Sequence, residues 1–330
     1  MKKIAVTGAS GHIGNNICRH LLSEGYQLKV LTRNGDEESL SGLDLEKVSG
    51  DLSSRNSLDK LMQGSEIVIH VAGKVSIYPK DKEEIFKTNI EGVKNVVDAC
   101  VKNGVKKLIH FSSVHAHKGF GPEVPINEQT PYSDNESSPY DYSKAQGEQI
   151  VIKARERNIE TVIVNPTAVI GPYDYNPSYS GKLFSDIYTG KLGSIVSGGF
   201  DWVDVRDIAV AIGAIIERDI KNEQFILSGN WASIKQLADR VCHAKGKKYR
   251  GITSPLRLAY IGLPFINLYS KITGTLPLYT TESLKAIKEG SKDVDHSHAK
   301  KMLDYSPRPF NESIDDTVKW LVNHYDLNHG

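Results

Sequence analysis

The sequence of 330 residues predicts an α/β protein in which a doubly wound parallel sheet is joined to a smaller helix-rich C-terminal region. Three observations predict this class. Short apolar runs alternate with longer amphipathic stretches up to Pro172, a glycine-rich turn follows the first run, and glycine and proline breaks replace the alternation afterwards. Strands that alternate with helices of this length imply right-handed crossovers, and hence a parallel sheet covered on both faces.

The strand candidates are short, rich in Val and Ile, and bounded by Gly, Asn or charged residues, as expected for buried strands. They cover residues 3–6, 27–32, 67–71, 107–112 and 161–165. The helix candidates between them cover residues 12–24, 57–63, 85–103 and 140–157. In the third helix, apolar residues recur on one face at helical spacing, which is typical of a helix packed against a sheet.

These elements divide the chain into a sheet domain, residues 1–172, and a region that we expect to bind a small molecule, residues 173–330. Segments 203–207 and 223–228 are interpreted as strands, so residues 200–230 are expected to return to the sheet. Further helices are expected at residues 233–243, 254–269, 280–289 and 311–325. The apolar stretch 256–269, which contains Gly262 and Pro264, predicts a core or lid helix, with a membrane or partner contact as the alternative.

The composition argues against several classes of protein. Lys and Arg number 41 and Asp and Glu number 40, so the charge does not indicate a nucleic-acid partner. The three Cys residues lie far apart, which favours free thiols in the cytoplasm. No apolar run reaches the roughly 18 residues that span a bilayer. Two His-X-His pairs, at His115 and His296, lack a third ligand at suitable spacing, so no metal is expected.

The glycine-rich turn at residues 7–14 lies between the first strand and the first helix. Gly8 would allow the tight turn, Gly11 would let backbone amides approach a pyrophosphate, and Gly14 would let the helix pack against the strand. The N-terminus of the helix would then face the negative charge. This arrangement predicts a nicotinamide dinucleotide site. The residues expected to contact the dinucleotide are Gly8, Ser10, Gly11, His12, Ile13 and Gly14.

The second strand is followed by Arg33, and this residue bears on the choice of cofactor. An NAD-selective site places a carboxylate at this strand end to bind the ribose 2′-hydroxyl. Arg33 could instead pair with the 2′-phosphate of NADP, whereas Asp36 and Glu37 come too late to act as the strand-end carboxylate. The sequence therefore favours NADP(H) over NAD(H), with an exposed loop cation as the alternative.

Tyr140 and Lys144 are four residues apart, so a helix would place them on one face. A nearby ammonium lowers the pKa of a phenol toward the working range of an acid or base. Neighbouring Tyr142 has no Lys at the same spacing. The strand at residues 107–112 ends in the pair Ser112-Ser113, which would deliver a hydroxyl to the carboxyl edge of the sheet, where ligands bind. These residues together indicate proton transfer to a substrate oxygen.

The motifs resemble those of the extended short-chain dehydrogenase/reductase superfamily, a group of NAD(P)-dependent epimerases, dehydratases and reductases with a Rossmann-type fold. The resemblance covers nearly the whole chain. Its further motifs, in the family order, are Gly50-Asp51-Leu52, His70-Val71-Ala72-Gly73, Thr88-Asn89, Asn165-Pro166 to Gly171-Pro172, and Ser306-Pro307-Arg308 to Trp320. Arg33 and the run from Val164 to Thr167 are most similar to the dihydroflavonol reductase-like branch of ketone and aldehyde reductases.

The resemblance implies a catalytic trio of Ser113, Tyr140 and Lys144, with Lys144 also holding the nicotinamide ribose. It further implies that Asp51 and Leu52 lie at the adenine, that Val71, Ala72 and Gly73 line the cofactor beneath the pyrophosphate and ribose, that Asn89 supports the lysine, and that Pro166 and Thr167 pack against the nicotinamide. The likeness to sugar-nucleotide enzymes is weaker. Where those enzymes carry Tyr-Gly or Asp-Glu near the serine, this chain has His117-Lys118 and Val114-His115.

Four residues are candidates for the substrate site. His115 and His117 follow the catalytic strand, with a loop or surface position as the alternative. Tyr175 and Tyr179 come after the cofactor-binding strands and could form an aromatic wall for an apolar substrate, or could take part in ordinary packing.

The sequence thus predicts a cytoplasmic NADPH-dependent reductase. It would transfer hydride to the ketone or aldehyde carbonyl of a small substrate that is apolar or bears a ring. The alternatives are a sugar-nucleotide epimerase or dehydratase and a non-catalytic dinucleotide-sensing protein. A homodimer formed through the helices at residues 85–103 and 140–157 is a family-based expectation.

Overall fold

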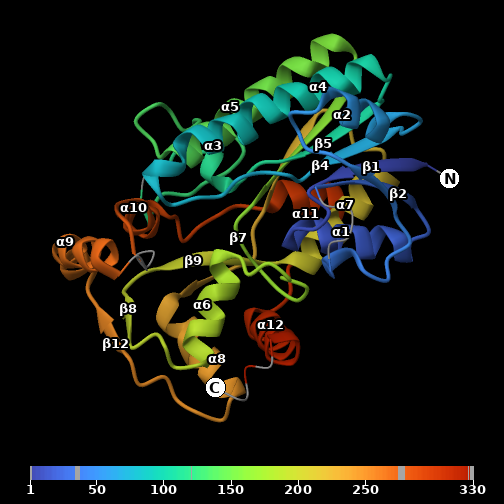
Figure 1. The fold of residues 1–330 in the computed structure, drawn as a ribbon. Coiled ribbons are helices and arrows are strands. Elements are labelled where there is room, and N and C mark those ends of the chain that lie inside the picture. The colour runs from blue at the N-terminus through green and yellow to red at the C-terminus, as the bar shows by residue number, and fades with distance from the viewer. Residues whose placement is uncertain (1, 34–37, 120, 274–278, 326, 328–330) are drawn as a thin grey trace.

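The computed structural model describes residues 2–33, 38–119, 121–273, 279–325 and 327, and its main feature is a seven-stranded, all-parallel sheet (Figure 1). The strand order is β10-β6-β5-β4-β1-β2-β3. The strands are β1 Lys3–Thr7, β2 Gln27–Thr32, β3 Glu46–Ser49, β4 Ile67–His70, β5 Lys107–Phe111, β6 Glu160–Pro166 and β10 Glu223–Leu227. The order reverses direction at β1, which has β4 on one side and β2 on the other, and ligands of such sheets bind beyond the strand ends at this point.

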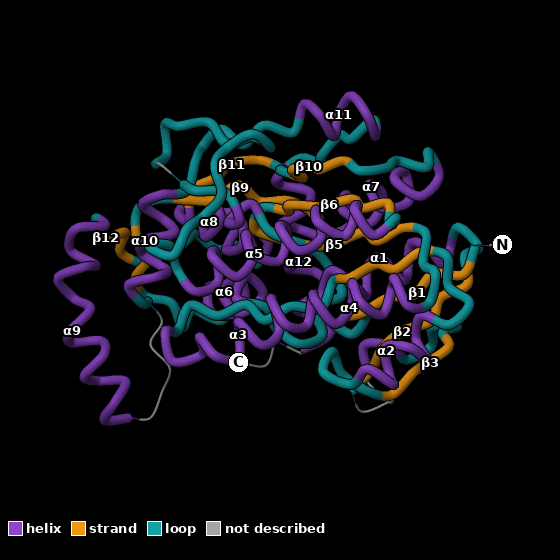
Figure 2. Tube along the Cα trace, turned by 90° about the horizontal axis from the view of Figure 1, so that it is seen from above, coloured by secondary structure: helices purple, strands orange, loops and turns teal. Residues whose placement is uncertain are grey.

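Helices cover both faces of this sheet, as Figures 1 and 2 show. One layer contains α1 His12–Ser23, α7 Val205–Glu217 and α11 Ser297–Leu303, and the other contains α2 Arg55–Met62, α4 Gly92–Lys102 and α5 Pro139–Lys153. The alternation of side chains along a strand produces the two cores. In β1, Ile4 and Val6 belong to the core beneath α1 and α7, while Ala5 belongs to the core beneath α2, α4 and α5.

The five strands and four helices expected before Pro172 are confirmed, with ends that differ by a few residues. Strand β3 was not predicted, because Glu46 and Lys47 make this edge strand polar and exposed. The helix expected at residues 85–103 consists of three consecutive pieces: α3 Lys82–Phe86, a π-helical turn Lys87–Glu91, and α4. The fragment after α5, Ala154–Arg157, is a 3₁₀ turn.

Residues 200–230 were expected to return to the main sheet, and only part of this segment does so. Residues 223–228 were expected as a strand, and β10 pairs in parallel with β6 there. The strand expected at residues 203–207 is wrong. Strand β9, Gly199–Asp204, belongs to a separate three-stranded sheet of order β11-β9-β7, and α7 begins at Val205 because the Asp204 side chain caps it by accepting from the Arg206 amide.

The second region has its own hydrophobic core beside this small sheet. Its strands are β7 Ala168–Ile170, β9 and β11 Asn230–Ser233, with β8 Ser194–Val196 and β12 Ile252–Ser254 forming a second pair. Its helices are α6 Tyr179–Tyr188, α8 Ile234–Ala244, α9 Leu256–Thr273, α10 Thr281–Glu289 and α12 Phe310–Tyr325. Helix α6 was not predicted, because Gly181 and Gly190 suggested breaks; the Ser178 side chain caps it by accepting from the Gly181 amide.

Helix α9 differs from the expectation of a core helix. Leu263 is buried, but Ile261 and Phe265 on another face are mostly exposed, so the core interpretation is wrong for that face. No helix in the described residues is both long and apolar enough to cross a membrane.

Candidate active site

The glycine-rich turn joins β1 to α1 at the point where the strand order reverses. Gly8 adopts a φ of +77°, and a Cβ there would lie 2.5 Å from the backbone nitrogen of Ala72. A Cβ on Gly14 would lie 2.1 Å from the carbonyl oxygen of Gly8. These two positions therefore require glycine, one because of its conformation and its close approach to β4, the other because α1 packs against the turn.

The outer side of the turn fits a phosphate group. Gly11 is the N-cap of α1, and no side chain caps the first amides of this helix. Leaving out the chain neighbours of Gly11, a Cβ on this residue would have only the Gly8 carbonyl oxygen within 4 Å, at 3.4 Å, so the N-cap position is open on that side. Uncapped amides at a helix N-terminus attract anions. Ser10 and Ile13 lie in the same turn, and His12 Nε2 hydrogen-bonds to the carbonyl oxygen of Pro172 at 3.1 Å.

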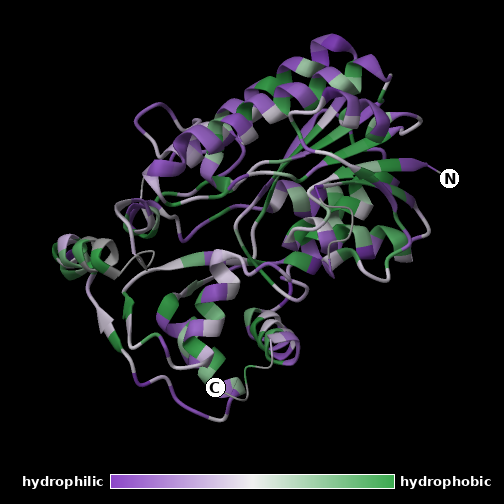
Figure 3. Cartoon of the chain, viewed as in Figure 1, coloured by the Kyte–Doolittle hydropathy of each residue, from purple (hydrophilic) through white to green (hydrophobic). Residues whose placement is uncertain are grey.

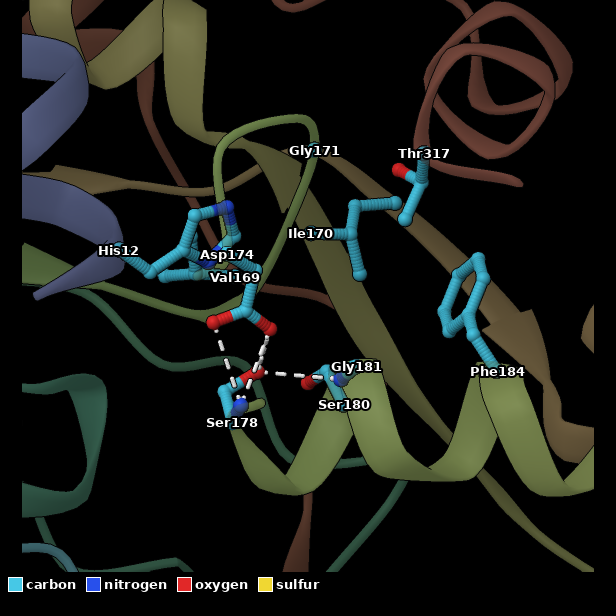
Figure 4. Close-up of a pocket in the computed structure, with 10 residues that line it drawn as sticks. All are labelled: His12, Val169, Ile170, Gly171, Asp174, Ser178, Ser180, Gly181, Phe184 and Thr317. Carbon is cyan, nitrogen blue, oxygen red and sulfur yellow. Dashed lines mark hydrogen bonds between the residues drawn. The ribbon is translucent and has the colours of Figure 1, made fainter. Parts of the chain in front are cut away.

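A small hollow lies beside this turn, between α1, β7, α6 and α12 (Figure 4). The buried Asp174 carboxylate accepts hydrogen bonds from the Ser178 amide and hydroxyl, so it orders the start of α6. Apart from His12, the lining contains none of the predicted cofactor or catalytic residues. Its lining residues are His12, Val169, Ile170, Gly171, Asp174, Ser178, Ser180, Gly181, Phe184 and Thr317. The hollow is thus a neighbour of the candidate site and not its centre.

The residues expected at the adenine end follow β2 and β3. Arg33 is exposed at the end of β2, whereas Asp36 and Glu37 lie outside the described residues. Asp51 is exposed, and its Oδ1 accepts from the Ser53 amide and hydroxyl, which holds the pKa of its carboxyl below the usual range. Leu52 packs against Gly92 of α4, where a Cβ would approach it to 2.9 Å. This loop therefore presents Asp51 at the sheet edge on a packed support.

Val71, Ala72 and Gly73 continue from β4 along the carboxyl edge of the sheet. The Val71 amide donates to the Thr7 carbonyl at 3.1 Å, which ties this segment to β1. A Cβ on Gly73 would lie 3.4 Å from both Asn89 Oδ1 and Lys144 Nζ. The end of β4, the π-helical turn and α5 therefore meet at one place.

Asn89 is buried in that π-helical turn, a feature that often marks functional sites in helices. Its amide group accepts from the Lys74 nitrogen at 2.8 Å and donates to the Lys74 oxygen at 2.9 Å. It also donates to the Ser143 hydroxyl at 3.0 Å. Asn89 thus holds the loop after β4 against α5, next to the catalytic candidates.

Tyr140 stands in the first turn of α5, which begins at Pro139 and is capped by the Ser138 side chain. The Ser113 side chain at the end of β5 hydrogen-bonds to its phenol and lowers the pKa, but burial acts more strongly and raises the pKa of Tyr140 to about 12. The phenol therefore carries its proton at neutral pH. Ser113 also accepts from the His115 amide at 3.2 Å, which fixes its hydroxyl group.

Lys144 lies one turn further along α5 and is buried. Its ammonium donates to the carbonyl oxygen of Phe111, the last residue of β5, at 2.9 Å. Burial lowers the pKa of Lys144 to about 8, and the nearby Glu148 carboxylate opposes this shift. The structure brings Ser113, Tyr140, Lys144 and Asn89 together around the ends of β4 and β5, as the sequence predicts for an active site.

The two histidines after β5 occupy different surroundings. His115 is half-buried, its ring lies edge-on to Tyr140 with centroids 6.2 Å apart, and its Nδ1 is 3.4 Å from the Asp141 carboxylate. His117 is buried, stacks on Tyr132, and hydrogen-bonds to the Thr130 carbonyl at 2.8 Å. His115 therefore lies beside Tyr140, whereas His117 belongs to the packing of the following loop.

The two candidate tyrosines of the second region, Tyr175 and Tyr179, also lie in different surroundings. Tyr175 packs edge-on against Trp320 and accepts a hydrogen bond from Arg19 at 3.2 Å, so it joins α12 to α1. Tyr179 is 44% exposed at the start of α6 and interacts electrostatically with Tyr78, in the loop after β4. Tyr179 thus lies near the loop that follows β4, whereas Tyr175 lies between α12 and α1.

Pro166 is buried at the end of β6, and Thr167 follows it. The Thr167 hydroxyl donates to the Asp201 carboxylate at 2.6 Å, and its amide donates to the carbonyl of Leu227. Thr167 therefore fastens the link between the two sheets.

Sequence reasoning missed Asp141, which contacts His115 beside Tyr140, and Tyr78, which interacts electrostatically with Tyr179. The position of Asp141 directly after Tyr140 could have indicated that it lies near the site. The sequence around Tyr78 contains no such indication. Among the described residues, no group of three His, Cys, Asp or Glu could hold a metal ion.

The fold and this site define a dinucleotide-binding protein with a catalytic centre at the carboxyl edge of a parallel sheet. Residues 4–228 match the NAD dependent epimerase/dehydratase family, and the chain belongs to this family. The match confirms the predicted superfamily, its Rossmann-type fold and the class of NAD(P)-dependent oxidoreductases. The roles of individual site residues stay predictions.

Two curated proteins are similar over almost their whole lengths. Sterol demethylase protein B of Methylococcus capsulatus is 30% identical, with 96% of this chain and 97% of that protein covered. A putative dihydroflavonol 4-reductase of Synechocystis is 28% identical, with 97% and 94% covered. These relatives agree with the predicted reductase-like branch.

Solved structures show the same fold. The crystal structure of gox2253 superposes with a TM-score of 0.85 at 31% identity and covers 98% of both chains. A UDP-glucose 4-epimerase of Thermotoga maritima superposes with a TM-score of 0.80 at 21% identity, with 98% of this chain and 99% of that chain covered, which is a likeness of fold alone.

Proposed function

We propose that the chain is an NADPH-dependent reductase that converts a ketone or aldehyde carbonyl of a small apolar or ring-bearing substrate to an alcohol. The observation that carries this proposal is the protonated phenol of Tyr140, which Ser113 orients at the sheet edge. A carbonyl oxygen that gains negative charge needs both a hydrogen-bond donor and a proton source. Tyr140 and Ser113 supply these two groups.

When bound, the dinucleotide supplies hydride to the carbonyl carbon. Ser113 would orient the carbonyl through its hydroxyl, and Tyr140 would donate the proton to the oxygen. Lys144 would stabilise the resulting phenolate by its positive charge and hold the nicotinamide ribose, while Asn89 keeps the surrounding loop in place. The uncapped amides of α1 would bind the pyrophosphate.

Arg33 supports NADP(H) as the cofactor, because a guanidinium at the end of β2 suits a 2′-phosphate better than a ribose hydroxyl. In Arg33→Asp we expect the ratio of kcat/KM for NADPH to that for NADH to fall by at least about tenfold, as expected for the loss of a charge-assisted contact. Steady-state kinetics with both cofactors checks this. An unchanged ratio would mean that Arg33 does not contact the 2′-phosphate.

The substrate class is supported by the names of two relatives, which refer to a sterol and to a dihydroflavonol. The exposed Tyr179 and the half-buried His115 add aromatic surface, near the loop after β4 and beside Tyr140 respectively. Such surface suits an apolar or ring-bearing molecule.

The test is NADPH oxidation against a panel of aldehydes, cyclic ketones, sterol ketones and sugar nucleotides. A reductase consumes NADPH in proportion to the product formed from one of the carbonyl compounds. Conversion of a sugar nucleotide without net NADPH consumption would instead identify an epimerase or dehydratase. A homodimer through α4 and α5 and a cytoplasmic location stay predictions.

A further inference from the structure

Helix α9 carries an exposed apolar stripe at the periphery of the molecule, where Figure 3 shows hydrophobic residues on a helix that projects from the body. The stripe consists of Leu258 (58% exposed), Ile261 (66%), Phe265 (73%), Leu268 (58%) and Ile272 (76%). The intervals alternate between three and four residues, so the side chains share one face of the helix. Large apolar side chains gathered in this way mark a binding surface.

The sequence that contains this stripe is rich in basic residues, although Glu282 and Glu289 of α10 lie near Tyr260 of α9. Residues 240–281 contain seven Lys and Arg and neither Asp nor Glu, although the whole chain has a net charge of only +1. We call residues 240–281 the basic segment. Within it Lys247, Lys248, Arg250 and Arg257 are exposed, and none of them forms an ion pair with a residue that the structure describes. Their charge is therefore available to a negatively charged partner.

Helix α9 is linked through α10 to two loops that flank the candidate site. Helix α10 packs against α9, as Figure 1 shows, and anchors the rim of the site. The Thr280 hydroxyl donates to the Ile77 carbonyl at 3.0 Å, in the loop after β4, and Lys285 donates to the Glu136 carbonyl at 3.4 Å, just before α5. A surface that binds the apolar stripe would therefore lie close to the loops that flank the candidate site.

We propose that α9 docks on the surface of a bilayer that contains anionic phospholipid, with the stripe among the acyl chains and the exposed Lys247, Lys248, Arg250 and Arg257 at the headgroups. An apolar face without acidic residues, flanked by Lys and Arg, is typical of helices that lie in the interface. The helix does not span the bilayer. A second copy of the chain fits less well, because pairing of the two stripes would bring two basic segments together.

Vesicle co-sedimentation of the full chain tests the proposal, and its readout does not depend on the proposed reductase activity. We expect binding to vesicles of phosphatidylcholine and phosphatidylglycerol in equal parts, and much weaker binding to phosphatidylcholine alone. High salt should weaken the binding. Absence of binding to the anionic vesicles would overturn the proposal.

Variants separate the two contributions. Ile261→Ser with Phe265→Ser should reduce the partition coefficient by at least about tenfold through the lost apolar contact, and Lys247→Glu with Lys248→Glu should reduce it by a similar factor through charge. Val210→Ser is the matched control, since Val210 is 51% exposed on α7, outside the basic segment, and should bind like the parent chain. Equal binding by all variants would overturn the proposal.

Sedimentation in the absence of vesicles tests the alternative that a second copy of the chain covers α9. If the stripe variants convert a dimer to a monomer and vesicle binding does not change, then a second copy covers α9 and the bilayer proposal is wrong. An unchanged oligomeric state together with lost vesicle binding supports it.

Discussion

The cofactor-binding sheet and the C-terminal region differ in how they present functional side chains. In the sheet, the candidate residues are buried or backed by short hydrogen bonds, as with Lys144 on the Phe111 carbonyl and Asn89 on Lys74. In the C-terminal region, Tyr179 and the stripe of α9 are exposed. The difference fits our proposals, in which the buried residues at the sheet carry out the chemistry, Tyr179 contacts the substrate and the stripe of α9 contacts a bilayer.

The largest expected effect comes from Tyr140→Phe, which removes the proposed proton donor at the sheet. We expect kcat to fall by about a thousandfold, the scale of general acid catalysis, with little change in NADPH affinity. Tyr142→Phe is the control, because Tyr142 lies in the same helix, packs near Phe86, and lacks a lysine four residues later. Comparable losses in both variants would remove Tyr140 from its proposed role.

Two substitutions in the glycine-rich turn should separate an effect on the stability of the protein from an effect on NADPH binding. In Gly14→Ala, the added Cβ would collide with the Gly8 carbonyl, so we expect a loss of about 2 kcal/mol in the free energy of unfolding. In Gly11→Ala, the Cβ would make only an ordinary van der Waals contact with the Gly8 carbonyl oxygen, so we expect a stability change within about 1 kcal/mol but weaker NADPH binding. Chemical denaturation and fluorescence titration check the pair. Equal destabilisation of the two variants would contradict it.

The same contrast explains what the sequence could and could not predict. The turn and the apolar strands are local signals, because glycine conformation and strand burial follow from neighbouring residues. Strand β3 was not predicted because its own residues are mostly polar. Ion pairs of Glu46 with Lys3 of β1 and Lys29 of β2 stabilise the strand, and such tertiary contacts cannot be read from the sequence of the segment. For α9 the sequence left a core or lid helix and a membrane or partner contact both open, because apolar periodicity indicates an apolar partner without saying whether that partner is the protein itself.

Tertiary context also decided the positions of individual site residues. The i and i+4 spacing predicts that Tyr140 and Lys144 share a face, and the structure places both next to β5. The π-helical turn that buries Asn89 has no local signature. His115 and His117 look alike in sequence, yet only His115 approaches Tyr140, because the chain turns between them.

The pH dependence tests whether burial tunes Lys144. Its pKa is lowered to about 8, so the ammonium loses its proton as the pH rises through 8, and the positive charge that we propose stabilises the phenolate is lost. We therefore expect kcat/KM for reduction to be constant between about pH 6 and 7 and to fall by up to about tenfold per pH unit above 8, since kcat/KM reports groups of the free enzyme. A profile that stays flat to pH 10 would show that the charge of Lys144 is not needed.

The smallest effects are expected in the C-terminal region, where Tyr175 and Tyr179 form a matched pair. Tyr179→Ala should raise the KM several-fold and leave stability nearly unchanged, because the side chain is exposed and we propose that it contacts the substrate. Tyr175→Ala should lower the free energy of unfolding by about 2 kcal/mol and leave the KM unchanged, because its ring packs against Trp320 and His324. Thermal unfolding and steady-state kinetics measure both. If Tyr175→Ala raised the KM and Tyr179→Ala did not, the substrate would enter between α1 and α12, and the proposed contact of Tyr179 with the substrate would be wrong.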